Sequence, residues 1–108
     1  MKSAEQGDHL SQSMLGYMCD NGIGVKQSYQ EAAKWYLKAV ENGDPSIQLR
    51  LGYLYSDGLG VKQNHKEATK WYRKAAEQGK VGAQINLGIA YYHGDGVSKD
   101  LQEAFKWF

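Results

Sequence analysis

Apolar residues recur along the chain at the spacing of amphipathic helices. Ile47, Leu51, Leu54 and Tyr55 follow one another at i, i+4, i+7 and i+8, and a helix with 3.6 residues per turn brings such positions onto one face. A matching stripe runs through residues 83–91. The pattern predicts a helix in each segment, with this face buried.

A second kind of stripe follows the first. Ala32, Trp35, Tyr36, Ala39 and Val40 occupy i, i+3, i+4, i+7 and i+8, so they also share one face of a helix. Because the alanines are small, a neighbouring helix can approach this face closely. We therefore expect two kinds of helix to alternate along the chain.

The same residues return every 36 positions. Leu15 and Gly16 recur as a Leu-Gly pair at 51–52 and at 87–88. Glycines 22 and 24 with Val25, and the Glu-Ala-x-Lys-Trp motif of 31–35, recur with the same offset. Such a period is the signature of a repeat architecture. We divide the chain into units 8–43, 44–79 and 80–108, the last truncated, with 1–7 as the end of a preceding second helix.

The helix boundaries carry capping signals. Asp44 precedes Pro45, so a carboxylate can accept from the first-turn amides while proline at the first helical position loses no hydrogen bond. Asp8 is expected to cap the first unit in the same way, whereas Lys80 offers no acceptor and predicts a less well fixed helix start. Gly58 is expected to end its helix with a positive φ.

Each second helix begins with a potential capping box, in which a short acceptor stands three residues before a glutamate that can reach back to the cap amide. The pairs are Ser28 with Glu31, Asn64 with Glu67, and Asp100 with Glu103.

A single helical hairpin cannot bury its own apolar face, so neighbouring hairpins must supply the core. We predict an all-α fold: an α-solenoid, a right-handed superhelix of stacked antiparallel hairpins with a 36-residue period. The expected core residues are Leu15, Trp35, Leu51, Tyr55, Trp71, Leu87, Tyr91 and Trp107.

Composition narrows the function. The 108 residues carry a formal net charge of +1. Proteins that bind nucleic acids or anionic membranes usually have an excess of positive charge, so neither kind of partner is expected. One cysteine excludes an internal disulfide framework, and no apolar run reaches the roughly 20 residues that span a bilayer. These features do not identify the cellular compartment of the protein.

Candidate catalytic and metal sites have simpler structural explanations. His9, His65 and His93 fall in different repeat positions, without the close spacing of zinc ligands, so no metal or cofactor is expected. Cys19 stands where the other units have tyrosine, which favours a packed, inert thiol over an activated nucleophile. The Gly-x-Gly turns lack the Lys-Ser/Thr pair of a phosphate loop.

Residues that differ between the units are the better candidates for binding. Opposite the apolar stripe of the first helices, one strip per unit should lie side by side and form a concave groove. Its members, as a partner-binding site, are Met14, Tyr17, Asn21, Arg50, Tyr53, Asp57, Asn86, Ile89 and His93. The alternative is that the apolar members pack one first helix on the next. The polar members carry more of the binding hypothesis, because packing does not require them, and Arg50 is expected to meet acidic groups of a peptide.

The repeated pattern resembles a known family. Leu-Gly-x-x-Tyr, then Gly-x-Gly-Val, then Ala-x-x-Trp-Tyr-x-Lys-Ala-Ala-x-x-Gly, clearest over 51–79, is similar to the Sel-1-like repeat, a relative of the tetratricopeptide repeat. The resemblance implies a non-enzymatic scaffold for protein–protein interaction, of a kind known in bacteria and eukaryotes.

Two alternatives stay open. One branch of the family has paired cysteines and has been linked to binding or hydrolysis of β-lactams in the cell envelope, a branch that a lone Cys19 does not fit. The chain could also be a structural spacer in a longer repeat protein. Because neither end carries a polar capping element, we expect a longer array or self-association, with Trp107 and Phe108 exposed or swapped.

Overall fold

The computed structural model describes residues 8–108, and within them all regular secondary structure is helical, with no strand. The prediction that residues 1–7 form the end of a preceding helix lies outside the described residues. The elements are α2 (His9–Asn21), α3 (Tyr29–Ala39) with a 3-10 turn, η1 (Val40–Asn42), then α4 (Pro45–Asp57), α5 (His65–Glu77), α6 (Val81–His93) and α7 (Leu101–Trp107).

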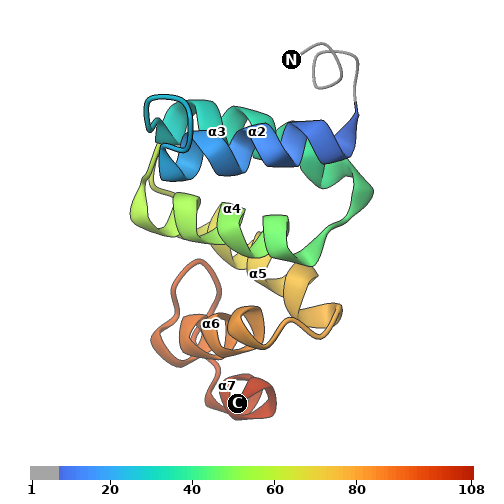
Figure 1. Ribbon diagram of the computed structural model, residues 1–108. Helices are drawn as coiled ribbons and strands as arrows, with labels where there is room; N and C mark the ends of the chain where they lie inside the picture. The colour runs from blue at the N-terminus through green and yellow to red at the C-terminus, as the bar shows by residue number, and fades with distance from the viewer. Residues whose placement is uncertain (1–7) are drawn as a thin grey trace.

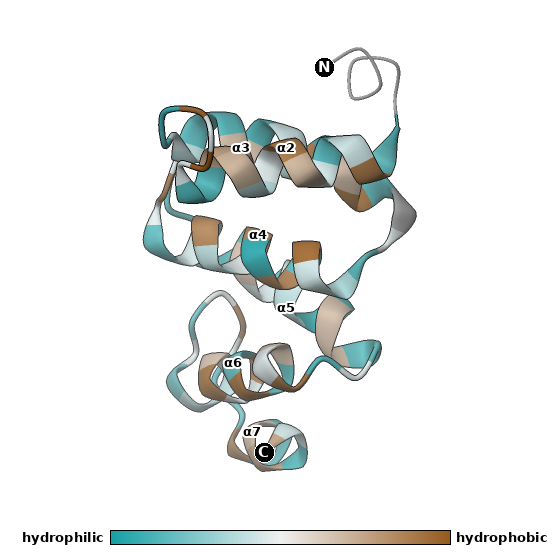
Figure 2. Cartoon of the chain, viewed as in Figure 1, coloured by the Kyte–Doolittle hydropathy of each residue, from teal (hydrophilic) through white to brown (hydrophobic). Residues whose placement is uncertain are grey.

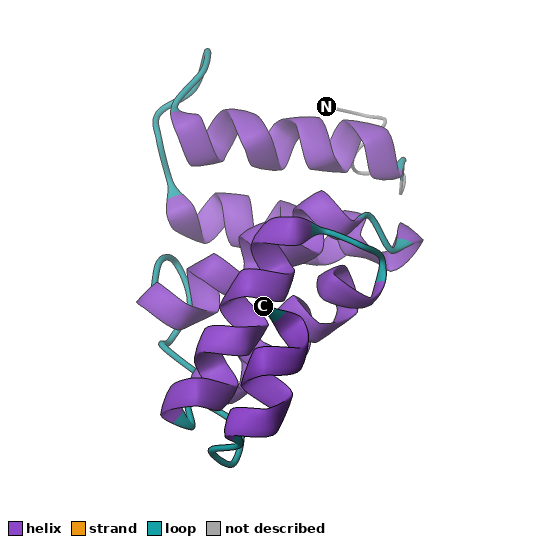
Figure 3. Cartoon of the chain, turned by 90° about the horizontal axis from the view of Figure 1, so that it is seen from below, coloured by secondary structure: helices purple, strands orange, loops and turns teal. Residues whose placement is uncertain are grey.

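The helices form three antiparallel pairs stacked one on the next (Figure 1). Helix α2 pairs with α3, α4 with α5, and α6 with α7, while α3 packs on α4 and α5 on α6. The stack is elongated, with extents of 47 × 24 × 18 Å, and the view from below shows α7 lying across its end (Figure 3). The predicted all-α solenoid of helical hairpins is confirmed.

The first helix of each pair starts and ends as its sequence predicts. The Asp8 carboxylate accepts from the amides of Leu10 and Ser11, and the Asp44 carboxylate accepts from Ser46. Lys80 makes no side-chain cap hydrogen bond. Glycines 22, 58 and 94 end these helices in the left-handed region, where a side chain would be strained.

The capping boxes form only in part. The Ser28 hydroxyl accepts from the amide of Glu31, but the Ser28 amide donates to the carbonyl of Cys19, at 2.8 Å. Asn64 and Asp100 repeat both bonds, with the carbonyls of Tyr55 and Tyr91. The cap amide is thus satisfied by the preceding helix, and the expected return bond from glutamate is replaced. The glutamates instead lie near lysines three residues on, in the pairs Glu31–Lys34, Glu67–Lys70 and Glu103–Lys106.

The core runs between the two helices of each pair and on into the next pair. Apolar and polar residues alternate along the helices (Figure 2). Leu51 and Leu87 are fully buried, and Trp35 and Trp71 are buried. The other residues expected in the core, Leu15, Tyr55, Tyr91 and Trp107, are partly buried and pack against it.

The two buried tryptophans are covered by lysine side chains. The ammonium groups of Lys34 and Lys38 lie 5.3 and 4.9 Å from the centre of the Trp35 ring. Lys70 and Lys74 flank Trp71 in the same way. The lysines that line the second helices therefore shield the indoles, each contact contributing about 0.5–1 kcal/mol at such exposed sites.

A glycine in each first helix sits directly against an aromatic ring of the second. A Cβ built on Gly52 would lie 2.4 Å from the Tyr72 ring. The equivalent pairs are Gly16 with Tyr36, at 2.7 Å, and Gly88 with Phe108, at 2.5 Å. No real Cβ tolerates such distances, so the repeated Leu-Gly pair exists because the ring occupies the place of a side chain.

A second glycine sets the spacing between pairs. A Cβ on Gly60 would lie 2.3 Å from the Tyr29 carbonyl at the start of α3, and one on Gly96 would lie 2.3 Å from the His65 carbonyl at the start of α5. Beside the latter contact, the Thr69 hydroxyl donates to the carbonyl of Asp95. The loop of each later hairpin is thereby seated on the second helix of the hairpin before it.

Replacement of Gly52 by alanine should therefore destabilise the protein. We expect Gly52→Ala to lower the free energy of unfolding by about 1–3 kcal/mol, because the added methyl group forces the Tyr72 ring outward. The matched control is Gly82→Ala, also in a first helix, whose Cβ would meet the end of the Leu49 side chain at 3.2 Å and the Tyr53 hydroxyl at 3.9 Å. Urea denaturation followed by circular dichroism measures both. A Gly52→Ala protein at least as stable as the Gly82→Ala protein would contradict this packing.

Candidate functional site

A cavity of about 410 Å³ opens between α2 and α4, at the junction of the first and second hairpins. It combines hydroxyl, charged and aromatic groups with one buried aliphatic side chain. Its lining residues are Ser13, Tyr17, Asp20, Asn21, Tyr36, Ser46, Ile47 and Arg50.

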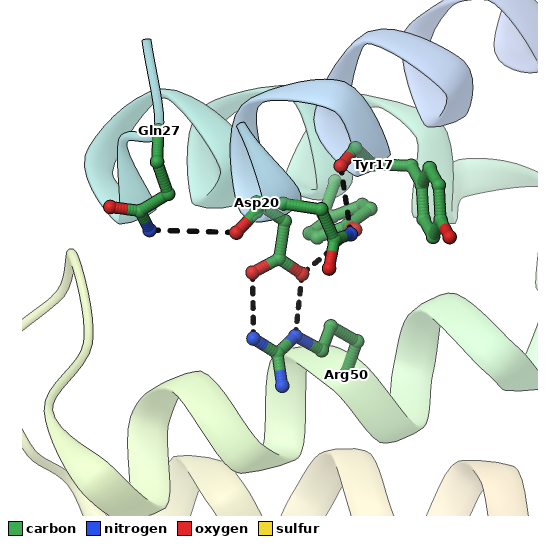
Figure 4. A network of polar contacts seen from close by, with 6 residues as sticks. Tyr17, Asp20, Gln27 and Arg50 are labelled. Atoms are coloured by element: carbon green, nitrogen blue, oxygen red, sulfur yellow. Dashed lines mark hydrogen bonds and ion pairs between the residues drawn. The ribbon is translucent and has the colours of Figure 1, made fainter. Parts of the chain in front are cut away.

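A network of polar contacts forms one wall of this cavity (Figure 4). Arg50 of α4 donates from Nε and Nη2 to the two carboxylate oxygens of Asp20 on α2, each at 2.6 Å. The Tyr36 hydroxyl of α3 donates to the same carboxylate, at 3.0 Å. Three helices from two hairpins thus meet at one carboxylate, and the paired contact of arginine with it fixes the plane of the guanidinium.

The two partners of this ion pair differ in how deeply they are buried. The Asp20 side chain is 4% exposed, whereas that of Arg50 is 36% exposed. An incoming group can therefore reach the guanidinium but not the carboxylate. Asp20 takes two of the five N–H donors of Arg50, so three remain on the edges that face away from it.

Arg50 and Tyr36 both keep their protons near neutral pH. Hydrogen bonding to Asp20 raises the pKa of Arg50, although burial opposes this, so the guanidinium stays charged. Burial, with the nearby Asp20 charge, raises the pKa of Tyr36. Because the phenol keeps its proton, it remains a donor to the carboxylate.

The residues predicted to line a groove take three kinds of position. Tyr17, Asn21 and Arg50 meet at the cavity. Tyr53 and Asn86 are half-buried and joined by a 3.1 Å hydrogen bond from the Asn86 amide to the Tyr53 hydroxyl. The exposed residues that do not line this cavity are Met14, Asp57, Ile89 and His93.

Two of the polar members differ from the sequence interpretation. Arg50 and Asn86 were expected to be free of packing roles, yet each bonds a side chain of the preceding first helix. Asn86 and Ile89 also border a smaller hollow of about 90 Å³ against α5. Arg50 is thus already paired before any ligand arrives, and only its outer donors are available.

The sequence interpretation missed Asp20 and Tyr36, although the repeats hold a signal for them. The signal is a relation between residues sixteen apart: Asp20 and Tyr36, Ser56 and Tyr72, Tyr92 and Phe108. Where the second residue is tyrosine, the first is a small polar residue, and where the second is phenylalanine, it is not. Burial raises the pKa of Tyr72 to about 12, with a hydrogen bond to Ser56 lowering it in part. Ser13, Ser46 and Ile47 were missed as well.

The second junction shows why the first one is hollow. Leu49 stands at the position equivalent to Ser13 and reaches toward Gly82, which replaces Ser46. Tyr53 lies edge-on to Tyr72, with ring centres 5.9 Å apart, whereas its equivalent Tyr17 is 57% exposed. At the first junction Ser13 replaces Leu49 and the equivalent tyrosine, Tyr17, is exposed, so the space stays open.

Metal binding and membrane insertion find no support in the described residues. Residues 8–108 contain no group of three or more His, Cys, Asp or Glu side chains placed to hold a metal ion. Nor does any described helix have the length and apolar character needed to cross a bilayer.

The ion pair predicts a coupling between Asp20 and Arg50. We expect Arg50→Asn to cost about 1–3 kcal/mol of unfolding free energy, because it leaves a buried carboxylate without its cation. The double variant Asp20→Ser with Arg50→Asn reproduces the residues of the second junction, Ser56 and Asn86, and should recover most of that loss. A double-mutant cycle in urea measures the coupling. Strictly additive effects would show that the pair does not stabilise the junction.

Cys19 should be unreactive in the folded protein. It is 7% exposed, and burial raises the pKa of its thiol, so little reactive thiolate is present or accessible. We expect modification by a disulfide reagent at pH 8 to be at least about tenfold slower than in urea. Equal rates in the two conditions would contradict the packed, inert thiol.

Comparison with known proteins agrees with the fold. The family model for the Sel1 repeat matches three times, at residues 9–44, 45–80 and 81–108. No curated protein shows a significant match. Sel1 repeat proteins are helical repeat scaffolds that typically mediate protein interactions and are generally non-enzymatic.

Three solved structures illustrate the likeness. The crystal structure of c5321, a protective antigen of uropathogenic Escherichia coli strains with an SLR fold, matches with a TM-score of 0.91 and 45% identity over 97% of this chain. A Sel1 repeat protein from Oxalobacter formigenes matches with a TM-score of 0.88 and 41% identity over 94% of this chain. Helicobacter pylori cysteine rich protein B matches with a TM-score of 0.74 and 26% identity over 98% of this chain and 80% of that one.

This chain spans 22% of c5321 and 42% of the Oxalobacter protein. The glycine contacts, the helical pairs and the three matched repeats all lead to one assignment: the chain belongs to the Sel1 repeat family.

Proposed function

We propose that this chain is a non-enzymatic scaffold that binds a segment of a partner protein on its first-helix surface. By first-helix surface we mean the exposed side chains of α2, α4 and α6. The observation that carries the proposal is the cavity at the junction of α2 and α4, which is lined in part by the exposed Tyr17 of α2.

Apolar exposure on this surface supports binding of a protein. Met14 and Tyr17 of α2 are 53% and 57% exposed, and Ile85 and Ile89 of α6 are 47% and 42% exposed. Tyr17 and Ile89 share one repeat position with Tyr53, and Met14 shares one with Arg50. Tyrosine and arginine are the residue types that most often anchor protein interfaces. Tyr17 and Arg50 are therefore the anchors that we propose.

The proposed binding site contains all the groove residues expected from the sequence, but these residues contribute unequally to binding. Tyr17, Asn21 and Arg50 form its centre. Tyr53 and Asn86 belong to the next junction, between α4 and α6, where they bond each other. The flanking members are Met14, Asp57, Ile89 and His93.

Selection of peptides tests this function. Random linear peptides displayed on phage are selected on the immobilised protein and then measured on variants. Tyr17→Ser removes an exposed side chain of the first-helix surface, while Leu37→Ser removes one of similar size that is 38% exposed on the second helix α3. We expect the selected peptides to bind Leu37→Ser as tightly as wild type and Tyr17→Ser about tenfold more weakly, as for a hot-spot residue.

Circular dichroism and thermal unfolding of both variants check that the fold is retained. Failure to select any peptide, or peptides that depend on Leu37 and not on Tyr17, would contradict binding at the first-helix surface.

A further inference from the structure

We propose that the cavity between α2 and α4 receives the carboxylate of an internal Asp or Glu side chain of the bound segment, with Arg50 as its main donor. This inference rests on the proposed function and adds the chemistry of the bound residue.

Arg50 is prepared for such a ligand before binding. Asp20 holds two of its N–H groups at 2.6 Å, and Tyr36 holds Asp20 in turn. The guanidinium therefore loses little further freedom when a second carboxylate arrives. Figure 4 shows its third nitrogen directed away from Asp20. The free donors match the geometry of a carboxylate, which two parallel N–H groups bind well.

A second cation stands at the rim of the cavity. Lys80, at the start of α6, donates from Nζ to the hydroxyl of Ser46, at 3.1 Å, and Ser46 lines the cavity. Arg50 and Lys80 place two positive groups at the cavity, and the carboxylates of Asp20 and Asp44 balance them, since Asp44 accepts from the Ser46 amide at 2.9 Å. The attraction for an incoming carboxylate therefore comes from the N–H donors of Arg50 that Asp20 does not use.

The surroundings favour an acidic residue within a chain over a chain terminus. Exposed apolar side chains lie on both sides of the cavity along the first helices, Met14 on α2 and Ile85 and Ile89 on α6. A bound segment that covers the apolar side chains of both α2 and α6 passes across the cavity, so the residue in the cavity lies within the segment and not at its end. The residues equivalent to Arg50 in the other repeats are Met14 and Asn86. This repeat position therefore carries a charge only in the second unit.

The test uses pools of nine-residue peptides with both ends blocked and a fixed central residue. Four pools carry Glu, Gln, Lys or Leu at the centre, with randomised flanks, and each is selected on the wild-type protein. We expect the Glu pool to give the strongest recovery. For the peptides recovered, exchange of the central Glu for Gln should weaken binding about tenfold, as expected for hydrogen bonds to a charged group.

Three variants locate the binding of the carboxylate. Ser13→Leu fills the cavity with the side chain that the second repeat has at this position, and leaves the pair of Asp20 and Arg50 intact. Lys80→Met removes the cation at the rim, and Lys62→Met removes a lysine from an exposed loop as its matched control. We expect Ser13→Leu and Lys80→Met to reduce the preference for Glu over Gln, and Lys62→Met to leave it unchanged.

The outcomes separate this inference from the proposed function. Peptides that depend on Tyr17 but bind equally with Glu or Gln at the centre would overturn the carboxylate site and leave the scaffold function standing. Recovery from the Lys pool, or a Glu preference that survives in Ser13→Leu, would overturn it as well. Loss of all peptide binding on the wild-type protein would overturn both.

Discussion

The close approach of the two helices in each hairpin is the constraint on which the rest of the structure depends. Gly16 and Gly52 leave just enough room for the rings of Tyr36 and Tyr72. The ring that enters this space also brings its hydroxyl to a polar partner on the first helix, where the Tyr36 hydroxyl donates to Asp20 and the Tyr72 hydroxyl is hydrogen-bonded with Ser56. A glycine in one helix thus determines where a polar group stands between two repeats.

Some repeat positions hold the same kind of residue in every unit and build the stack, whereas others differ from unit to unit. The constant glycines seat each loop on the preceding hairpin, as Gly60 does on α3, and a short polar side chain caps the start of each second helix. The variable positions fall at the junctions between first helices. One junction carries Asp20 and Arg50 beside a cavity, whereas the other is filled by Leu49 and Tyr53. Two junctions of one backbone therefore offer different surfaces, which is how a repeat protein can acquire specificity without altering its fold.

The fold could be predicted from the sequence because its determinants are local and periodic. The stripe through Leu51 and the acceptor at Asp44 each act within a few residues, and the period of 36 repeats them. The site was harder to predict. Arg50 and Asp20 lie 30 residues apart and meet only once the register of two neighbouring hairpins is known. The return bond of the capping boxes was predicted from the second helix alone, whereas the Ser28 amide donates to the carbonyl of Cys19 in the first helix of the same hairpin.

The contact between glycine and ring can be measured directly in solution. In a nuclear Overhauser spectrum, the account predicts strong cross-peaks from the Hα protons of Gly16 and Gly52 to the ring protons of Tyr36 and Tyr72, with those Hα resonances displaced by the ring current. Absence of these cross-peaks, with glycine Hα resonances at ordinary positions, would contradict the close helix pairing from which the junctions and the site follow.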